Sequence, residues 1–199
     1  LNDEIDFDKL DIVLLGGGSD REQLLVCNRL KQIKEDINNY VNNNGVLIAI
    51  CSGYQMLGHY YKLKHETIEG LSILDIYTEM GDSRMIGNVV IECKLMNEPI
   101  KVVGFENHGG RTYINDHQPL GIIKHGWGNN GTDGQEGVLY KNVIGTYLHG
   151  PLLPKNPMIA DYILSNALKN AYPDTFVQLQ PLDDSIELMA RDYIVNRFS

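Results

Sequence analysis

Cys51 is the residue of this sequence best placed for covalent chemistry. It directly follows the apolar run 46–50, and Ser52-Gly53 then turns into a helical pattern. A thiol between a buried strand and a helix faces the positive end of the helix dipole, which favours the thiolate. Small neighbours, here Ala49 and Gly53, permit the strained turn of a nucleophile elbow. We therefore expect Cys51 to be a nucleophile, although a cysteine taken without this context is more often a buried apolar residue.

His149 is the candidate base for this thiol. It ends the run 143–148, and Gly150-Pro151 fixes the chain after it, so we expect its imidazole at the end of a sheet, where α/β sites form. Histidine titrates near neutral pH and is the usual partner of a nucleophilic cysteine. An arbitrary histidine is more often structural, and three others fit that alternative: His59, His65 and His117.

Backbone N–H groups near these residues complete a candidate acyl-transfer site. The N–H groups of Gly17, Gly18 and Ser52 are the expected donors to an oxyanion. A glycine triplet after a strand also suits a phosphate, but neither GxGxxG nor Walker spacing follows this one. Gln55 stands one helical turn after Cys51, so its amide either grips an amino-acid substrate or packs inside the helix.

A second polar stretch is expected at a sheet end. The segment Asn107-His108-Gly109-Gly110-Arg111-Thr112 follows a strand predicted over 100–105 and offers open backbone. Arg84 and Arg111 are candidate carboxylate ligands, because a guanidinium binds a carboxylate through two parallel hydrogen bonds. Either arginine also fits a surface ion pair.

Short β-branched runs that alternate with helical patterns predict an α/β fold. Residues 71–105 have the character of antiparallel or edge strands. We expect a single domain over 1–199. The principal elements predicted are strands over 11–15 and 46–50, a helix over 21–41, a hairpin over 137–147 that turns at Lys141-Asn142, and helices over 157–170 and 185–198.

Composition excludes several classes of function. The 199 residues are 43% hydrophobic, and a formal charge of −9 disfavours nucleic acid. Three widely spaced cysteines predict neither a disulfide framework nor a structural zinc site, and they are consistent with the reducing cytoplasm. No apolar run approaches the roughly 20 residues of a membrane span, and no signal peptide is recognisable.

Three strings, residues 16–18, 49–58 and 147–150, together resemble class I glutamine amidotransferases. The string Ala49-Ile50-Cys51-Ser52-Gly53-Tyr54-Gln55-Met56-Leu57-Gly58 is similar to the cobyric acid synthase branch of that class. The whole chain more narrowly resembles the GatD family, the glutaminase subunits of lipid II isoglutaminyl synthases. The strings that carry this narrower resemblance are residues 16–23, 104–113 and 145–151.

The resemblance implies a three-layer, flavodoxin-like fold with a mostly parallel central sheet, of which the first β-α unit is absent from the start of this chain. It implies that Cys51 attacks the side-chain amide of L-glutamine and that His149 protonates the departing ammonia. Glutamine would be bound by Gln55, Arg84, Asn107, His108, Gly109 and Gly110, with no metal.

The resemblance also implies a heterodimer. Ammonia would pass to a MurT-type, Mur-ligase-like subunit that holds ATP and Mg²⁺ and amidates the D-glutamate of lipid II, so this chain needs no cofactor of its own. Pro151 stands where many class members carry an acid, so a carboxylate of the partner is expected to orient His149. The alternatives are a cobyric or cobyrinic acid-type glutaminase and a non-catalytic glutamine-binding module.

Overall fold

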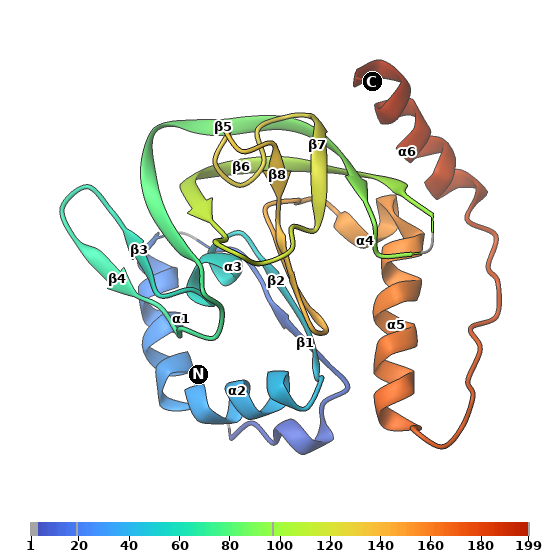
Figure 1. Cartoon of the computed structure of the whole chain (residues 1–199), viewed down its shortest axis with the longest axis horizontal. Helices are drawn as coiled ribbons and strands as arrows, with labels where there is room; N and C mark the ends of the chain where they lie inside the picture. Colours follow the sequence, from blue (N-terminus) through green and yellow to red (C-terminus); the bar gives the residue numbers. More distant parts are fainter. Residues whose placement is uncertain (1–3, 19, 97, 199) are drawn as a thin grey trace.

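Two β-sheets and their flanking helices form the framework of the protein (Figure 1). The computed structural model describes residues 4–18, 20–96 and 98–198. The elements in chain order are η1 (Phe7–Lys9), β1 (Ile12–Leu15), α1 (Asp20–Gln32), α2 (Lys34–Asn42), β2 (Val46–Ile50), α3 (Ser52–Met56), β3 (Tyr60–Lys62), β4 (Thr67–Glu69), β5 (Tyr77–Cys93), β6 (Ile100–Tyr113), β7 (Gly121–His125), β8 (Gln135–Glu136), β9 (Val138–Tyr140), β10 (Val143–Thr146), α4 (Leu152–Lys155), α5 (Pro157–Ala171) and α6 (Ser185–Phe198).

The first sheet has the strand order β1-β2-β10-β9. β2 pairs in parallel with both β1 and β10, whereas β9 is antiparallel to β10. The apolar run of β2 is almost entirely buried because this strand lies inside the sheet. The expected mostly parallel central sheet is therefore confirmed, and so is the hairpin that turns at Lys141-Asn142.

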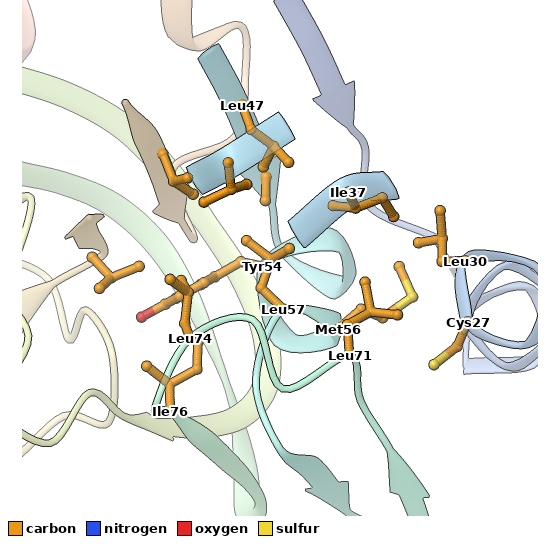
Figure 2. Packing of buried hydrophobic residues seen from close by; sticks show 14 of the residues in the cluster. Cys27, Leu30, Ile37, Leu47, Tyr54, Met56, Leu57, Leu71, Leu74 and Ile76 are labelled. Carbon is orange, nitrogen blue, oxygen red and sulfur yellow. The ribbon is translucent and has the colours of Figure 1, made fainter. Parts of the chain in front are cut away.

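Helices cover both faces of this sheet, which confirms the three-layer arrangement. Leu47 and Ala49 of β2 pack into a core shared with α1 and α2, part of which Figure 2 shows. Val46 and Ile48 point to the opposite face and pack with Ile159 of α5. Because side chains alternate along a strand, the short run of β2 supplies both cores.

The second sheet is mostly antiparallel and carries the order β4-β3-β5-β7-β8, with β6 also paired to β5. Val89 and Ile91 of β5 join the core that contains α5. Val90 of β5 points the other way and packs with Val103 of β6 and Val195 of α6. The long β5–β6 hairpin thus lies between the first sheet and α6.

Two predicted boundaries were wrong. The helix expected over 21–41 is divided at Ile33, where ψ of 22° departs from helical geometry, so α2 changes direction and buries Ile37 and Tyr40. The strand expected over 100–105 continues to Tyr113, because β5 provides a hydrogen-bonding partner along nearly its whole length.

β1 forms one edge of the first sheet, and its Leu14 is 63% exposed. Of the helices in the described part of the chain, none combines the length and the apolar character needed to span a membrane.

Candidate active site

Cys51 occupies the predicted strand-to-helix turn between β2 and α3. Its backbone has φ 54° and ψ −110°. This conformation is rare for a residue with a side chain, and holding it costs conformational free energy. The Cys51 N–H donates to the carbonyl of Thr146 at 2.9 Å, and its own carbonyl accepts from the N–H of Gln55 at 3.0 Å. These two bonds hold the strained turn, which is the geometry of a nucleophile elbow.

His149 and Cys51 meet beside Gly17. A Cβ placed on Gly17 would lie 3.2 Å from Cβ of Cys51 and 3.5 Å from Cε1 of His149. The two residues thus reach the same point from the chain that follows β2 and the chain that follows β10, two neighbouring strands of one sheet, as the sequence predicts. A side chain at position 17 would crowd this junction.

The His149 ring lies in a partly apolar environment. Burial, followed by the nearby His108, lowers the pKa of His149, so the neutral ring is favoured at pH 7. Its Nε2 atom is buried, and none of the described residues forms a hydrogen bond with it. His149 and Gly17 also line an apolar groove of about 560 Å³ beside β1 and α5.

A pocket of about 540 Å³, lined by both polar and apolar groups, opens next to Cys51. Seven of the predicted site residues line it, and Asp82 and Arg84 bring opposite charges to its wall. Its remaining lining was not singled out from the sequence. The lining residues are Gly18, Gln23, Cys51, Ser52, Gln55, Tyr61, Met80, Gly81, Asp82, Ser83, Arg84, His108 and Gly109.

The Gln55 amide belongs to a buried hydrogen-bond chain. Its Oε1 accepts from Nε2 of Gln23 at 3.2 Å, and its Nε2 donates to the hydroxyl of Tyr147 at 3.0 Å. The Tyr147 hydroxyl also lies 2.6 Å from Oγ1 of Thr112, which pairs with Thr78. Fixed in this way, the Gln55 amide has a defined orientation at the pocket.

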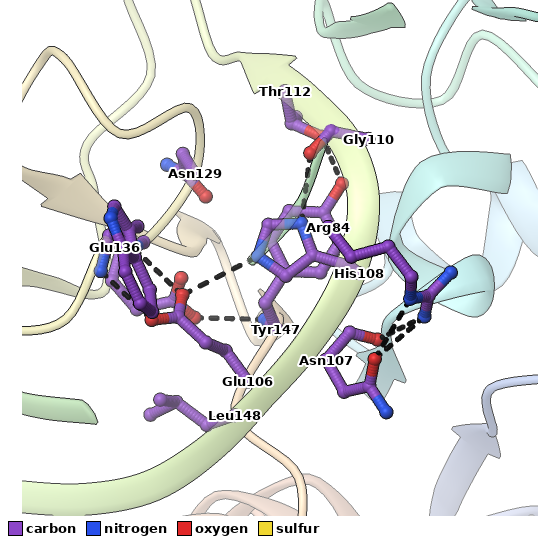
Figure 3. A network of polar contacts seen from close by, with 12 residues as sticks. Arg84, Glu106, Asn107, His108, Gly110, Thr112, Asn129, Glu136, Tyr147 and Leu148 are labelled. Atoms are coloured by element: carbon purple, nitrogen blue, oxygen red, sulfur yellow. Dashed lines mark hydrogen bonds and ion pairs between the residues drawn. The ribbon is translucent and has the colours of Figure 1, made fainter. Parts of the chain in front are cut away.

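Arg84 and Asn107 are bound to each other at the pocket wall (Figure 3). Nη2 of Arg84 donates to Oδ1 of Asn107 at 2.8 Å and to its backbone carbonyl at 3.0 Å, and Nε donates to the same Oδ1 at 3.1 Å. Asn107 itself is outside the pocket lining. It therefore acts on the pocket through the arginine that it holds.

His108 is buried against Tyr147, with ring centroids 3.6 Å apart and planes 6° apart (Figure 3). Its Nδ1 lies 2.8 Å from the carbonyl of Gly110 and must donate, because a carbonyl only accepts. Its Nε2 lies 3.5 Å from Oε2 of Glu106, and none of the described residues forms a hydrogen bond with this Nε2. The Glu106 carboxylate accepts from the N–H of Trp127 at Oε1 and from the N–H of Gly128 at Oε2. Neither Glu106 nor this loop contact was anticipated from the sequence.

Glu136 is the second carboxylate buried in this region. One of its oxygens accepts from the Thr146 hydroxyl and from the Tyr147 N–H, at the end of β10 that leads to His149. Burial, partly offset by these hydrogen bonds, raises the pKa of Glu136 to about 7. This residue organises the backbone that places His149.

The segment 107–112 was expected as open backbone, and that prediction was wrong for most of it. These residues continue β6, where His108 pairs with Met85 and Gly110 with Met80 of β5. Glycine fits here because a Cβ on Gly110 would lie 2.5 Å from Nε2 of Gln55. Gly109, between the two paired positions, is not paired with a residue of β5, and both Gly109 and His108 line the pocket.

The fold and site define a class of enzyme: residues 1–157 match the CobB/CobQ-like glutamine amidotransferase domain, and the chain belongs to this family. Two relatives are named subunit GatD of the glutamine-hydrolysing lipid II isoglutaminyl synthase. The Staphylococcus aureus (strain N315) protein is 43% identical over 97% of this chain and 77% of its own length. The Streptococcus pneumoniae (strain ATCC BAA-255 / R6) protein is 41% identical over 97% of this chain and 75% of its own length.

More distant similarity agrees with this assignment. A probable cobyric acid synthase of Methanocaldococcus jannaschii is 31% identical over 92% of this chain but only 39% of that protein. The solved structure of PurLQS from Thermotoga maritima superposes with a TM-score of 0.57 at 18% identity, covering 87% of this chain and 82% of that one. This structural similarity supports the fold.

Proposed function

We propose that this chain is the glutaminase subunit of a lipid II isoglutaminyl synthase. The glutaminase assignment is carried by the convergence of Cys51 and His149 beside Gly17. Cys51 also lines the pocket of Arg84 and Gln55, whereas His149 lines the neighbouring groove. The two relatives named GatD, each more than 40% identical over nearly the whole chain, support the choice of acceptor.

The chemistry follows from the arrangement at the turn. Neutral His149 takes the proton of the Cys51 thiol. The resulting thiolate attacks the side-chain amide carbon of L-glutamine, and the developing oxyanion is bound by the N–H groups of Gly17, Gly18 and Ser52. Ser52 is the first residue of α3, so its N–H has no acceptor within the helix. The C–N bond breaks as His149 protonates the leaving ammonia, and water then hydrolyses the thioester to glutamate.

Substrate recognition falls to the pocket wall. Arg84 would bind the α-carboxylate of glutamine, since it already lies in the wall with its guanidinium held by Asn107. Gln55, His108 and Gly109 line the same pocket and would contact the rest of the substrate. Gly110 contributes by leaving room for the Gln55 amide.

A partner subunit completes the proposed reaction. The relatives are named as subunits, and we propose a MurT-type, Mur-ligase-like partner in the cytoplasm that uses ATP and Mg²⁺ to activate the D-glutamate carboxylate of lipid II. Ammonia from this chain then displaces the activated group and gives isoglutamine. Pro151 stands where class members carry an acid, and a carboxylate from the partner would orient His149 in its place.

One reconstitution tests this proposal. The chain is incubated with glutamine, ATP and lipid II, with and without the Mur-ligase-like partner, and glutamate release and lipid II amidation are measured. We expect weak glutaminase activity alone, strong activity with the partner, and amidated lipid II only in the complete mixture. Full glutamine turnover without the partner would contradict the proposal that a carboxylate of the partner orients His149. Amidation of a corrinoid acid instead of lipid II would assign the cobyric acid synthase-type alternative.

A further inference from the structure

An extended bulge in β5 forms one wall of the pocket. β5 and β6 pair as Met80 with Gly110 and next as Met85 with His108, so residues 81–84 of β5 lie opposite Gly109 alone. A bulge of this kind redirects side chains away from the sheet, often beside an active site. All of residues 81–84 line the pocket, and Arg84 is the last of them.

The Arg111 guanidinium fills the inside of this bulge. Its Nη2 donates to the carbonyl of Ser83 at 2.8 Å, and its Nη1 donates to the carbonyls of Gly109 and Gly110, both at 3.2 Å. A Cβ on Gly81 would lie 2.4 Å from Cζ of Arg111, so the guanidinium packs directly on the backbone of the bulge. Arg111 therefore joins the bulge of β5 to β6.

These contacts need the shape of an arginine. Carbonyl groups in a bulge have lost their ladder partners, and the rigid planar fork of a guanidinium supplies several donors in fixed directions. A lysine ammonium is a single point charge on a flexible chain and cannot span both strands in the same way. The partners of Arg111 are backbone carbonyls, so we assign it a different role from Arg84.

We propose that Arg111 is a positioning residue for glutamine: it holds the 81–84 bulge in the form that presents Arg84 to the substrate carboxylate. The inference rests on the proposed glutaminase function and deepens it, because it assigns substrate affinity to a residue that does not contact the substrate. Loss of Arg111 should weaken glutamine binding while leaving the Cys51–His149 chemistry intact.

The test compares Arg111→Met and Arg111→Lys with wild type in the full chain together with its partner subunit. Four quantities are measured: kcat and KM for glutamine, the Kd for glutamine in a Cys51→Ala background, and the rate at which iodoacetamide alkylates Cys51. Iodoacetamide has no carboxylate for Arg84 to bind, so its alkylation rate reports the reactivity of the Cys51 thiol independently of the bulge. Lys124→Met is the matched control, since Lys124 is a partly exposed cation of β7 that pairs with Glu92.

We expect Arg111→Met to raise KM and Kd about tenfold or more, with kcat within about threefold of wild type and an unchanged alkylation rate. Arg111→Lys should give KM and Kd values between those of wild type and Arg111→Met. Lys124→Met should match wild type. Unchanged KM and Kd would overturn the inference, as would a parallel loss of kcat and alkylation rate, which indicates general distortion. If wild type binds glutamine but does not hydrolyse it, the proposed function fails while the Kd comparison still decides the role of Arg111.

Discussion

Phe105 and His149 exchange both of their backbone hydrogen bonds: the N–H of His149 donates to the Phe105 carbonyl at 2.8 Å, and the N–H of Phe105 donates back at 3.1 Å. This single bridge joins β6 of the second sheet to the residue that faces Cys51. β6 also carries His108 and Gly109 of the pocket. The position of His149 relative to the pocket is thus set by one continuous strand.

Gly53 allows α3 to pack closely against the end of β1. A Cβ at this position would lie 2.4 Å from the Leu15 carbonyl oxygen, so Gly53→Ala must displace β1 from α3. We expect a loss of about 1–3 kcal/mol in the free energy of unfolding, measured by urea denaturation. Gly16→Ala is the matched control, because a Cβ on Gly16 meets no atom within 4 Å. Equal losses in the free energy of unfolding for the two substitutions would argue against a steric clash between position 53 and the Leu15 carbonyl.

His149 should titrate below the range usual for histidine. Burial and the nearby His108 lower its pKa, so the midpoint of its titration lies below the usual histidine value. The acid limb of kcat/KM for glutamine should accordingly lie below pH 6.5, if neutral His149 is required. Histidine-labelled protein followed by NMR gives the titration directly, with His149→Asn to assign the signal. A midpoint above 6.5 would contradict the environment described for this ring.

Tyr147 connects the pocket to the buried hydrogen-bond chain. Tyr147→Phe removes the partner of the Gln55 amide and of Thr112. Leaving buried polar groups unpaired should cost about 1–3 kcal/mol of stability, and KM for glutamine should rise because Gln55 loses its orientation. Tyr40→Phe is the control: it loses hydroxyl bonds to Asp11 and Val46, far from the pocket lining. A similar KM for glutamine in both variants would show that the orientation of Gln55 does not contribute to glutamine recognition.

Glu136 should make stability depend on pH. Its pKa is raised from 4.5 to about 7 in the folded protein, so between these values the unfolded chain releases a proton that the folded chain retains. The Glu136 contribution to stability is therefore present below pH 4.5 and is lost as the pH rises toward 7.

In the Glu136→Gln variant the side chain at position 136 cannot ionise, so the loss of stability between pH 4.5 and 7 is absent. Relative to wild type, its free energy of unfolding should improve between pH 4.5 and 8 by an amount on the order of 3 kcal/mol. Denaturant titrations across this range measure the difference. Glu92→Gln, at a partly exposed carboxylate, should change by less than about 1 kcal/mol. A pH-independent difference for Glu136→Gln would refute the shifted ionisation.

Local patterns in the sequence were sufficient to locate the candidate nucleophile, Cys51, and its candidate partner, His149. The apolar run of β2 and the small residue after Cys51 indicate the elbow, and the β9–β10 hairpin indicates where His149 must lie. Both signals are contained within a few consecutive residues, so they need no knowledge of distant partners.

The features that the sequence did not predict depend on contacts between distant segments. The glycines of β6 resemble a loop, yet they fit a strand because Leu148 and Gln55 approach them closely. The bulge in β5 arises from the pairing register with β6, which no local pattern specifies. Gln23 enters the site only because α1 packs against α3, and a glutamine in a helix carries no such signal by itself.

We expect Cys51 to form a covalent glutamyl thioester during turnover, and acid-quenched mass spectrometry can detect this adduct. The full chain and its partner are mixed with glutamine, quenched within a turnover, digested and mapped. We predict a glutamyl adduct on the peptide that contains Cys51, absent from Cys51→Ala, whose glutamine hydrolysis should fall about 10³-fold or more, and retained in Cys93→Ala. Undiminished hydrolysis by Cys51→Ala, or an adduct on another residue, would contradict it.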